Sequence, residues 1–316
     1  MNLNYLLRRL VTLLLVLFGV SLLTFAIVPL VPGSPARIRL GIQATPETVA
    51  ALETQLGLDR PLPTQYLDWI SGIVLRFDFG SSLITDRPVT GEVARRLPAT
   101  LQLALVALLI GLAIALPAGI LAALKPGSFQ DVTAMVFSQL GVSVPDFWMG
   151  ILLIVLFAEV LGWLPSSGFV SITEGILPWL RHIVLPAMTA GLISGAIMTR
   201  FVRSAMLEVL GQDYIRTARA KGLHERRIIN KHALRNASIS IATIVGLQMA
   251  TLLSAIVVVE IIFAWPGLGS LALSATLQRD YPMLQASVLL FATAFAVVNL
   301  LTDLSYALLD PSVSYG

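Results

Sequence analysis

The hydrophobic positions along this 316-residue chain fall into six long runs that alternate with polar connectors. The runs cover approximately residues 10–30, 99–124, 132–161, 183–206, 238–263 and 284–309. Each reaches the length of about 20 residues that an α-helix needs to cross the hydrocarbon core of a bilayer. The pattern therefore predicts an all-α polytopic membrane protein with six transmembrane helices.

The first hydrophobic run follows Arg8 and Arg9, an order of charge and apolar residues that signal peptides share. The run is longer than the usual apolar region of about 7–15 residues in a signal peptide, and no small-residue cleavage site follows it. We therefore expect residues 1–30 to form an N-terminal segment and an uncleaved first transmembrane helix.

Residues 31–98 form the one long polar interlude and are expected to be a helical external domain on the periplasmic side. Thr45 and Pro46 have the signature of an N-cap and a first helical residue, and Gly57 can end that helix. Residues 63–76 and 88–97 predict two more helices. The remaining residues, 99–316, are expected to form a five-helix permease core.

The distribution of cations sets the orientation of this predicted topology. The connectors 162–182 and 264–283 contain only Arg181 and Arg279, whereas residues 200–237 carry the densest group of Arg and Lys in the chain. Cytoplasmic loops collect Lys and Arg. We therefore expect the basic connector and both termini on the cytoplasmic side.

Composition excludes several classes of protein. The chain is 56% hydrophobic and 12% charged, with a mean hydropathy of +0.85, whereas soluble domains carry about 25% charged residues. It has no Cys, its three His are scattered, and its net charge of +3 is concentrated beside membrane spans, so neither a metal site nor a nucleic-acid partner is expected. The sequence also lacks the glycine-rich phosphate-binding loop and the common hydrolase motifs, so we predict no catalytic residue and no cofactor in this chain.

The basic connector has a pattern of its own, expected over residues 207–237. Leu207, Leu210, Tyr214, Ala218 and Lys221 follow one another at the spacing of one helix face, and Gly222 stands where a helix can turn left-handed. A second helical pattern follows over residues 228–237. The spacing predicts a cytoplasmic helix-turn-helix between the fourth and fifth spans, although charge alone favours a positive-inside loop with a surface helix.

The sequence YIRTARAKGL…HALRNA in this connector resembles the coupling loop of ABC importer permeases of the dipeptide, oligopeptide and nickel uptake family. The general importer loop begins with Glu-Ala-Ala; here the matching positions are Arg216, Thr217 and Ala218, a departure that the peptide and nickel branch shares. The resemblance assigns ATPase coupling to Tyr214, Arg216, Thr217, Ala218, Arg219, Ala220, Lys221, Gly222 and Leu223. Ala218 and Gly222 would allow close docking, and Arg216, Arg219 and Lys221 would pair with acids of the ATPase.

This resemblance implies a permease subunit that forms half of a translocation pathway for di- or oligopeptides in a prokaryotic inner membrane. Its expected partners are a second homologous permease subunit, two cytoplasmic ATPase subunits that bind ATP and Mg, an external solute-binding protein and the lipid bilayer. Nickel, metal chelates and glutathione-like solutes are alternative substrates. An ATPase-independent secondary transporter is the alternative of a different class, but it leaves the coupling loop unexplained.

Ionisable residues and prolines inside the spans are candidates for the substrate pathway. Asp146 follows Pro145 in the third span and either faces a water-filled pathway or caps a local helix end. Glu260, near the external end of the fifth span, is either interfacial or part of the pathway. Pro117 and Pro186 are expected to break the second and fourth spans.

Overall fold

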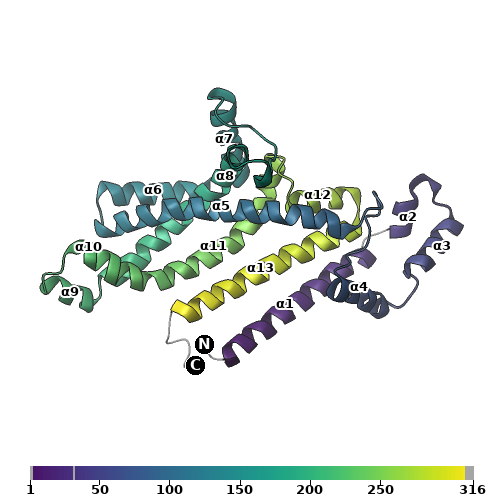
Figure 1. Cartoon of the computed structure of the whole chain (residues 1–316), viewed down its shortest axis with the longest axis horizontal. Coiled ribbons are helices and arrows are strands. Elements are labelled where there is room, and N and C mark those ends of the chain that lie inside the picture. The colour runs from purple at the N-terminus through teal and green to yellow at the C-terminus, as the bar shows by residue number, and fades with distance from the viewer. Residues whose placement is uncertain (1–2, 31–32, 310–316) are drawn as a thin grey trace. The chain divides into compact units, whose positions relative to one another are not determined.

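The computed structural model describes the backbone of residues 3–30 and 33–309, and the side chains within those ranges except at residues 3–6, 303 and 305–309. Helices account for most of the described chain, and a bridge between Ser81 and Pro88 is the one β-type pairing recorded in it. The all-α prediction is confirmed (Figure 1). The elements are α1 (Leu3–Leu30), α2 (Pro35–Leu40), η1 (Gly41–Gln43), α3 (Pro46–Leu56), α4 (Leu62–Arg76), α5 (Val89–Leu124), α6 (Phe129–Ser143), α7 (Asp146–Leu153), η2 (Ile154–Val160), η3 (Ile172–Glu174), α8 (Ile176–Leu210), α9 (Asp213–Ala220), α10 (Glu225–Arg227), η4 (Ile228–Ala233), α11 (Leu234–Ile262), α12 (Leu268–Gln278) and α13 (Tyr281–Leu309).

The membrane spans match the six predicted ones, with one correction. Five helices of the described chain are long and apolar enough to span a bilayer, and a sixth candidate is the pair formed by residues 129–143 and 146–160, bent by 107°. The third span is therefore not a straight helix. Val144, extended at φ −91° and ψ 123°, precedes Pro145, which disfavours helical geometry in the residue before it and lacks an N–H.

The other two prolines do not break their spans. The 36-residue helix α5 continues through Pro117, and α8 continues through Pro186. Membrane helices tolerate proline where neighbouring groups or local adjustments satisfy the freed carbonyl. The predicted breaks at these positions are wrong.

The chain divides into two compact units, each described here by itself. Unit 1 contains residues 1–8, 101–265 and 297–316, and unit 2 contains residues 9–100 and 266–296. Each unit combines segments from different predicted domains, so the two units do not test the predicted division into residues 1–30, 31–98 and 99–316. That division stays a prediction.

Within unit 2, the predicted cap residues are confirmed. The Thr45 side chain accepts a hydrogen bond from the Thr48 N–H at the start of α3, and Gly57 ends that helix with φ +69°. The loop after α4 is anchored at Asp280, where the Ser82 hydroxyl donates to one carboxylate oxygen at 2.5 Å and the Leu83 N–H donates to the other at 3.1 Å. Asp280 is buried, so it fixes this loop against the start of α13.

Within unit 1, α8 is the central helix, because it packs against α6, α7 and α11. Its fit with α5 depends on glycine: a Cβ on Gly191 would lie 2.8 Å from the Ala107 carbonyl oxygen, and one on Gly195 would lie 3.0 Å from the Gly111 carbonyl oxygen. Small residues of this kind let helix backbones approach closely in membranes.

Candidate functional site

The basic connector is built from two helical arms that continue the flanking spans. The span helix α8 ends at Leu210, and the short helix α9 begins at Asp213 after a break at Gly211 and Gln212. On the far side, α10, η4 and α11 follow one another without interruption from Glu225 to Ile262. The helix-turn-helix is confirmed, but its first arm is not one helix from Leu207 to Lys221.

The helix α9 has one buried face and one exposed face. Ile215 has no exposed surface and Ala218 retains 8%, and both pack in a hydrophobic cluster that includes Met206 of α8 and Ile228 of η4. Burying one Ile side chain stabilises a fold by about 1.5–3 kcal/mol. This contact therefore fixes α9 to the ends of both flanking spans.

The turn after α9 closes as the sequence predicts. Gly222 has φ +75°, its N–H donates to the Arg219 carbonyl at 2.9 Å, and the Leu223 N–H donates to the Ala218 carbonyl at 3.3 Å. Glycine adopts this left-handed conformation without steric cost. Apart from Gly222 itself and its two chain neighbours, no atom of the described residues lies within 4 Å of the position that a Cβ of Gly222 would occupy, so the turn is open on its outer side.

Two side-chain contacts brace the connector across this turn. The Arg219 guanidinium pairs with the Glu225 carboxylate at 2.7 Å, and this hydrogen-bonded partner raises the pKa of Arg219. The Asn236 amide at the start of α11 donates to the Tyr214 hydroxyl at 2.7 Å. Both contacts join α9 to the second arm, so the two arms are held together as one piece.

The nine predicted coupling residues therefore have different surroundings. Ala218 is buried against the chain's own core, Arg219 is engaged by Glu225, and Leu223 is half-buried beside the same cluster. The remaining six are exposed, and we call them the α9 surface: Tyr214, Arg216, Thr217, Ala220, Lys221 and Gly222. Arg216 keeps 75% of its side chain exposed, and its guanidinium makes a long 3.6 Å contact with the Asp213 carboxylate.

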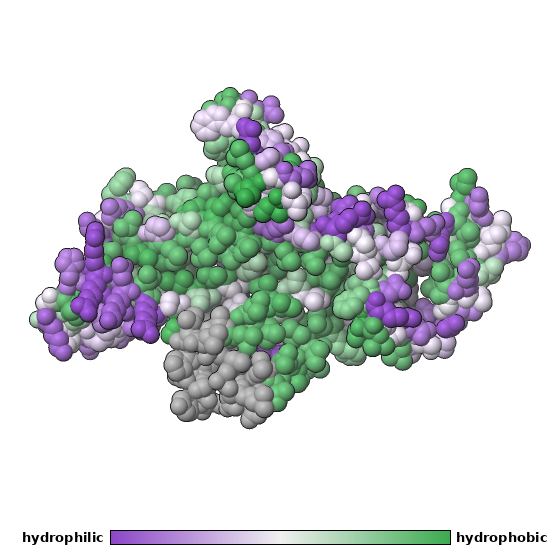
Figure 2. All heavy atoms as spheres, in the orientation of Figure 1, coloured by the Kyte–Doolittle hydropathy of each residue, from purple (hydrophilic) through white to green (hydrophobic). Residues whose placement is uncertain are grey.

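The space-filling view places this surface in a polar region of unit 1. Figure 2 shows α9 and α10 in the colours of hydrophilic residues, next to the hydrophobic surface of the long helices. An exposed, cationic and internally braced helix is suited to binding an acidic protein surface.

An ion pair that no local sequence pattern predicts joins α6 to α8. The Arg203 guanidinium binds both oxygens of Asp131, at 2.5 and 2.8 Å, and the Gly127 N–H donates to the same carboxylate at 2.9 Å. Asp131 is 5% exposed. The two residues stand 72 positions apart, so no local pattern reveals the pair.

The residues predicted for the substrate pathway lie in two different environments. Asp146 begins α7 directly after Pro145 and is partly exposed, and the N-cap residue Pro145 has no polar side chain with which to cap the helix. Glu260 lies near the end of α11 with no exposed surface, and the backbone N–H of Trp265 donates to its carbonyl at 2.8 Å. A pathway role for Asp146, Pro145 and Glu260 stays a prediction.

Comparison with known proteins gives consistent matches over nearly the whole chain. Residues 115–315 match the family described as binding-protein-dependent transport system inner membrane component, and residues 2–104 match its N-terminal counterpart. A putative peptide transport system permease protein of Brucella suis is 41% identical over 309 residues, which cover 98% of both chains. A di/tripeptide transport system permease protein of Pseudomonas aeruginosa and a glutathione transport system permease protein of Escherichia coli are each 42% identical, with 99% of both chains covered in each case.

A solved structure shares the fold at much lower sequence identity. A chain of a methionine ABC transporter in an inward-facing conformation matches with a TM-score of 0.58 and 17% identity, covering 70% of this chain and 97% of that chain. Together with the two family matches and the relatives above 40% identity, these findings show that the chain is a membrane-embedded permease subunit and belongs to the family of binding-protein-dependent transport system inner membrane components.

Proposed function

We propose that this permease subunit forms half of an ATP-driven import pathway for short peptides, and that separate ATPase subunits drive it through the α9 surface. The observation that carries the coupling role is the geometry of α9, a cationic helix exposed on one face and fixed to two spans on the other. Relatives named for peptides, di/tripeptides and glutathione favour a peptide substrate.

The proposed coupling is mechanical. Ile215 and Ala218 fix α9 to the ends of α8 and α11, and the Arg219–Glu225 pair closes the turn between the arms. A force applied to the exposed face of α9 therefore reaches both spans. Exposed Arg216 and Lys221 would pair with acidic side chains of the ATPase, where such pairs fix register and orientation.

The full assembly would contain this chain, a second homologous permease, two cytoplasmic ATPase subunits that bind ATP and Mg, and an external solute-binding protein. It would reside in a prokaryotic inner membrane. The basic connector and both termini would face the cytoplasm, in agreement with the positive-inside distribution of Arg and Lys.

Reversing one charge on the α9 surface tests the coupling role. In proteoliposomes that contain the whole transporter, Arg216→Glu should abolish ATP-dependent uptake and reduce ATP hydrolysis stimulated by the binding protein. Lys125→Glu is the matched control, because it makes the same charge change at an exposed position of residues 125–131, the connector between the second and third predicted spans. Equal uptake in wild type and Arg216→Glu would exclude the α9 surface as the coupling site.

The same proteoliposomes test substrate and energy source. Radiolabelled dipeptides, tripeptides, glutathione and nickel chelates, each offered with the binding protein and ATP, should give uptake of the peptides. Uptake of a nickel chelate alone would assign the alternative substrate. Uptake that persists without ATP would identify a secondary transporter.

A further inference from the structure

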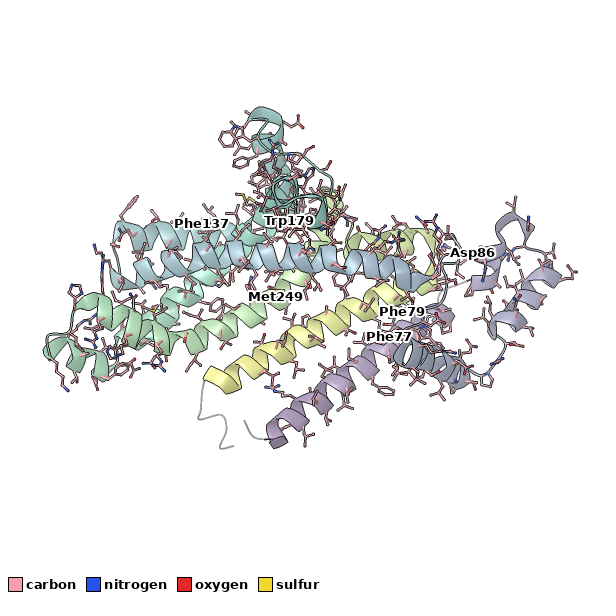
Figure 3. The ribbon with its side chains drawn as sticks, viewed as in Figure 1. Phe77, Phe79, Asp86, Phe137, Trp179 and Met249 are labelled. Atoms are coloured by element: carbon pink, nitrogen blue, oxygen red, sulfur yellow. The ribbon has the colours of Figure 1, made fainter. Side chains whose placement is uncertain are left out.

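The helix α4 has a wider apolar face than the protein covers. Tyr66, Trp69 and Ile73 point inward and are half-buried or buried. Leu67 and Val74 lie on the helix face next to these three residues and remain 62% and 65% exposed. Leu75 and Phe77, near the C-terminal end of α4, are also exposed, at 78% and 73%, and Figure 3 shows Phe77 at the end of α4.

Aromatic contacts hold α4 directly against the first transmembrane helix. The Tyr66 hydroxyl is hydrogen-bonded to the Ser21 hydroxyl at 2.7 Å, and the Tyr66 ring lies edge-on to Phe25 with 5.5 Å between centroids. Trp69 adds a second contact to Phe25 at 5.9 Å. All of these partners on α1 lie within the candidate span Leu7–Leu30.

These contacts set the depth of α4 relative to the membrane. Phe25 and Ser21 are five and nine residues before Leu30, the end of the span, which corresponds to about 7.5 and 13.5 Å along the axis at a rise of 1.5 Å per residue. Interfacial amphipathic helices bury their apolar faces about 5–10 Å into the boundary between headgroups and acyl chains. Tyr and Trp, the residues of α4 that contact α1, are also enriched at this level of a membrane.

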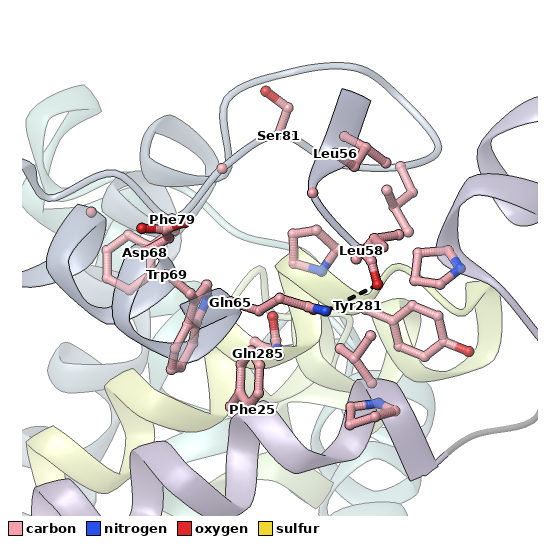
Figure 4. Close-up of a pocket in the computed structure, with 18 of the residues that line it drawn as sticks. Phe25, Leu56, Leu58, Gln65, Asp68, Trp69, Phe79, Ser81, Tyr281 and Gln285 are labelled. Carbon is pink, nitrogen blue, oxygen red and sulfur yellow. Dashed lines mark hydrogen bonds between the residues drawn. The ribbon is translucent and has the colours of Figure 1, made fainter. Parts of the chain in front are cut away.

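The polar side of α4 faces water. Gln65, Asp68 and Arg76 line an open cavity of about 1060 Å³ between α4, α3, the outer end of α1 and the start of α13. Figure 4 shows Gln65 and Trp69 with Phe25 and Tyr281 around this cavity. At the α-helical angle of about 100° per residue, Leu67 and Val74 lie roughly opposite Gln65 and Arg76.

We propose that α4 is a membrane-interfacial helix whose face formed by Leu67 and Val74 rests in lipid, in the leaflet where α1 ends. The molecule that covers this face is phospholipid, because the face lies at the depth of a transmembrane helix while the opposite face of α4 borders a polar cavity. Part of the segment 31–98, expected from sequence to be an external domain, is then embedded in the membrane surface.

Single cysteines test this placement, because the chain contains no Cys. The whole transporter would be placed in phospholipid nanodiscs with a nitroxide label at Leu67→Cys or Val74→Cys. Asp68→Cys on the polar side of α4 and Ala51→Cys on an exposed position of α3 are the matched controls. Accessibility of each label to oxygen, which concentrates in lipid, is compared with accessibility to a water-soluble nickel chelate.

We expect the labels at residues 67 and 74 to gain collisions with oxygen and lose collisions with the chelate relative to those at residues 68 and 51. Chelate accessibility equal to that at residue 68 would show that the face lies in water and would overturn the proposal. Low accessibility to both reagents would show that a protein partner covers the face, which also overturns it. None of these outcomes depends on the substrate or on coupling through α9.

Discussion

At the scale of single residues, the Asp131–Arg203 pair is the most consequential feature that local sequence patterns do not reveal. A buried carboxylate left without its partner costs about 3–5 kcal/mol, whereas removing both charges costs much less. We therefore expect Arg203→Ala to lower the free energy of unfolding by about 3 kcal/mol. This value is the lower end of that range, because the Arg203 side chain is 23% exposed.

Thermal unfolding of the purified protein in detergent measures this effect. The double variant Asp131→Ala/Arg203→Ala should be less destabilised than the sum of the two single variants, as a thermodynamic cycle of coupled residues requires. Strict additivity would mean that the two side chains do not stabilise one another.

Gly222 makes a second prediction at this scale. Its φ of +75° is unfavourable for a residue with a Cβ by roughly 1–2 kcal/mol, and β-branched residues are the worst suited to it. Gly222→Val should insert into the membrane normally but lose most uptake, because the left-handed turn is strongly disfavoured for a β-branched residue. Gly222→Asn should retain uptake, since Asn adopts this conformation more readily.

Uptake assays combined with immunoblots of membrane fractions distinguish these variants. Full uptake by Gly222→Val would show that the left-handed turn is dispensable. The contrast between Val and Asn thus separates backbone geometry from the mere presence of a side chain.

Individual residues also show what sequence can and cannot predict. Thr45, Gly57 and Gly222 were predictable because caps and left-handed turns depend on local residue type. The inward orientation of Ala218 was not, because it depends on the break at Gly211, which shifts the phase of α9 relative to α8. The face of a short helix follows from its start and its packing as much as from spacing.

At the scale of helices, prolines illustrate the same limit. Pro145 coincides with a bend of 107°, whereas α5 and α8 pass through Pro117 and Pro186. The residue type is the same in all three positions. What differs is whether the surrounding helices support a straight segment, and this information is absent from the local sequence.

The close approach of α5 and α8 gives a prediction at this scale. A Cβ on Gly119 would lie 2.7 Å from Val202 Cβ and 2.8 Å from the Thr199 carbonyl oxygen. Overpacking of this kind costs about 1–3 kcal/mol, so Gly119→Ala should lower the unfolding midpoint.

Gly91→Ala is the control on the same helix. Apart from its chain neighbours and the nearby backbone of its own helix, no atom of the described residues lies within 4 Å of its new Cβ, and Ala is favoured over Gly in a helix interior by about 1 kcal/mol. We expect this variant to unfold at the wild-type temperature or above it. An equal loss of stability in both variants would contradict a close contact specific to Gly119.

At the scale of the whole molecule, the number and positions of the spans were predictable from hydropathy, because every backbone group must be satisfied within lipid and helices achieve this locally. The grouping of residues 9–100 with 266–296 into one unit was not predictable, since it depends on contacts such as those of Asp280 with Ser82 and Leu83. Sequence alone therefore predicted the architecture better than its internal packing.

The central claim is that this chain receives force from a separate ATPase through the α9 surface. Photo-crosslinking in the assembled transporter tests it most directly, with a benzophenone amino acid in place of Thr217, an exposed residue of α9, or of Lys125. Lys125 is an exposed residue of the connector 125–131, which joins the second and third predicted spans and would also face the cytoplasm. Our account predicts that residue 217 crosslinks to an ATP-binding subunit and that residue 125 does so far less. Crosslinks from residue 217 to lipid alone, or equal ATPase crosslinking from both positions, would contradict it.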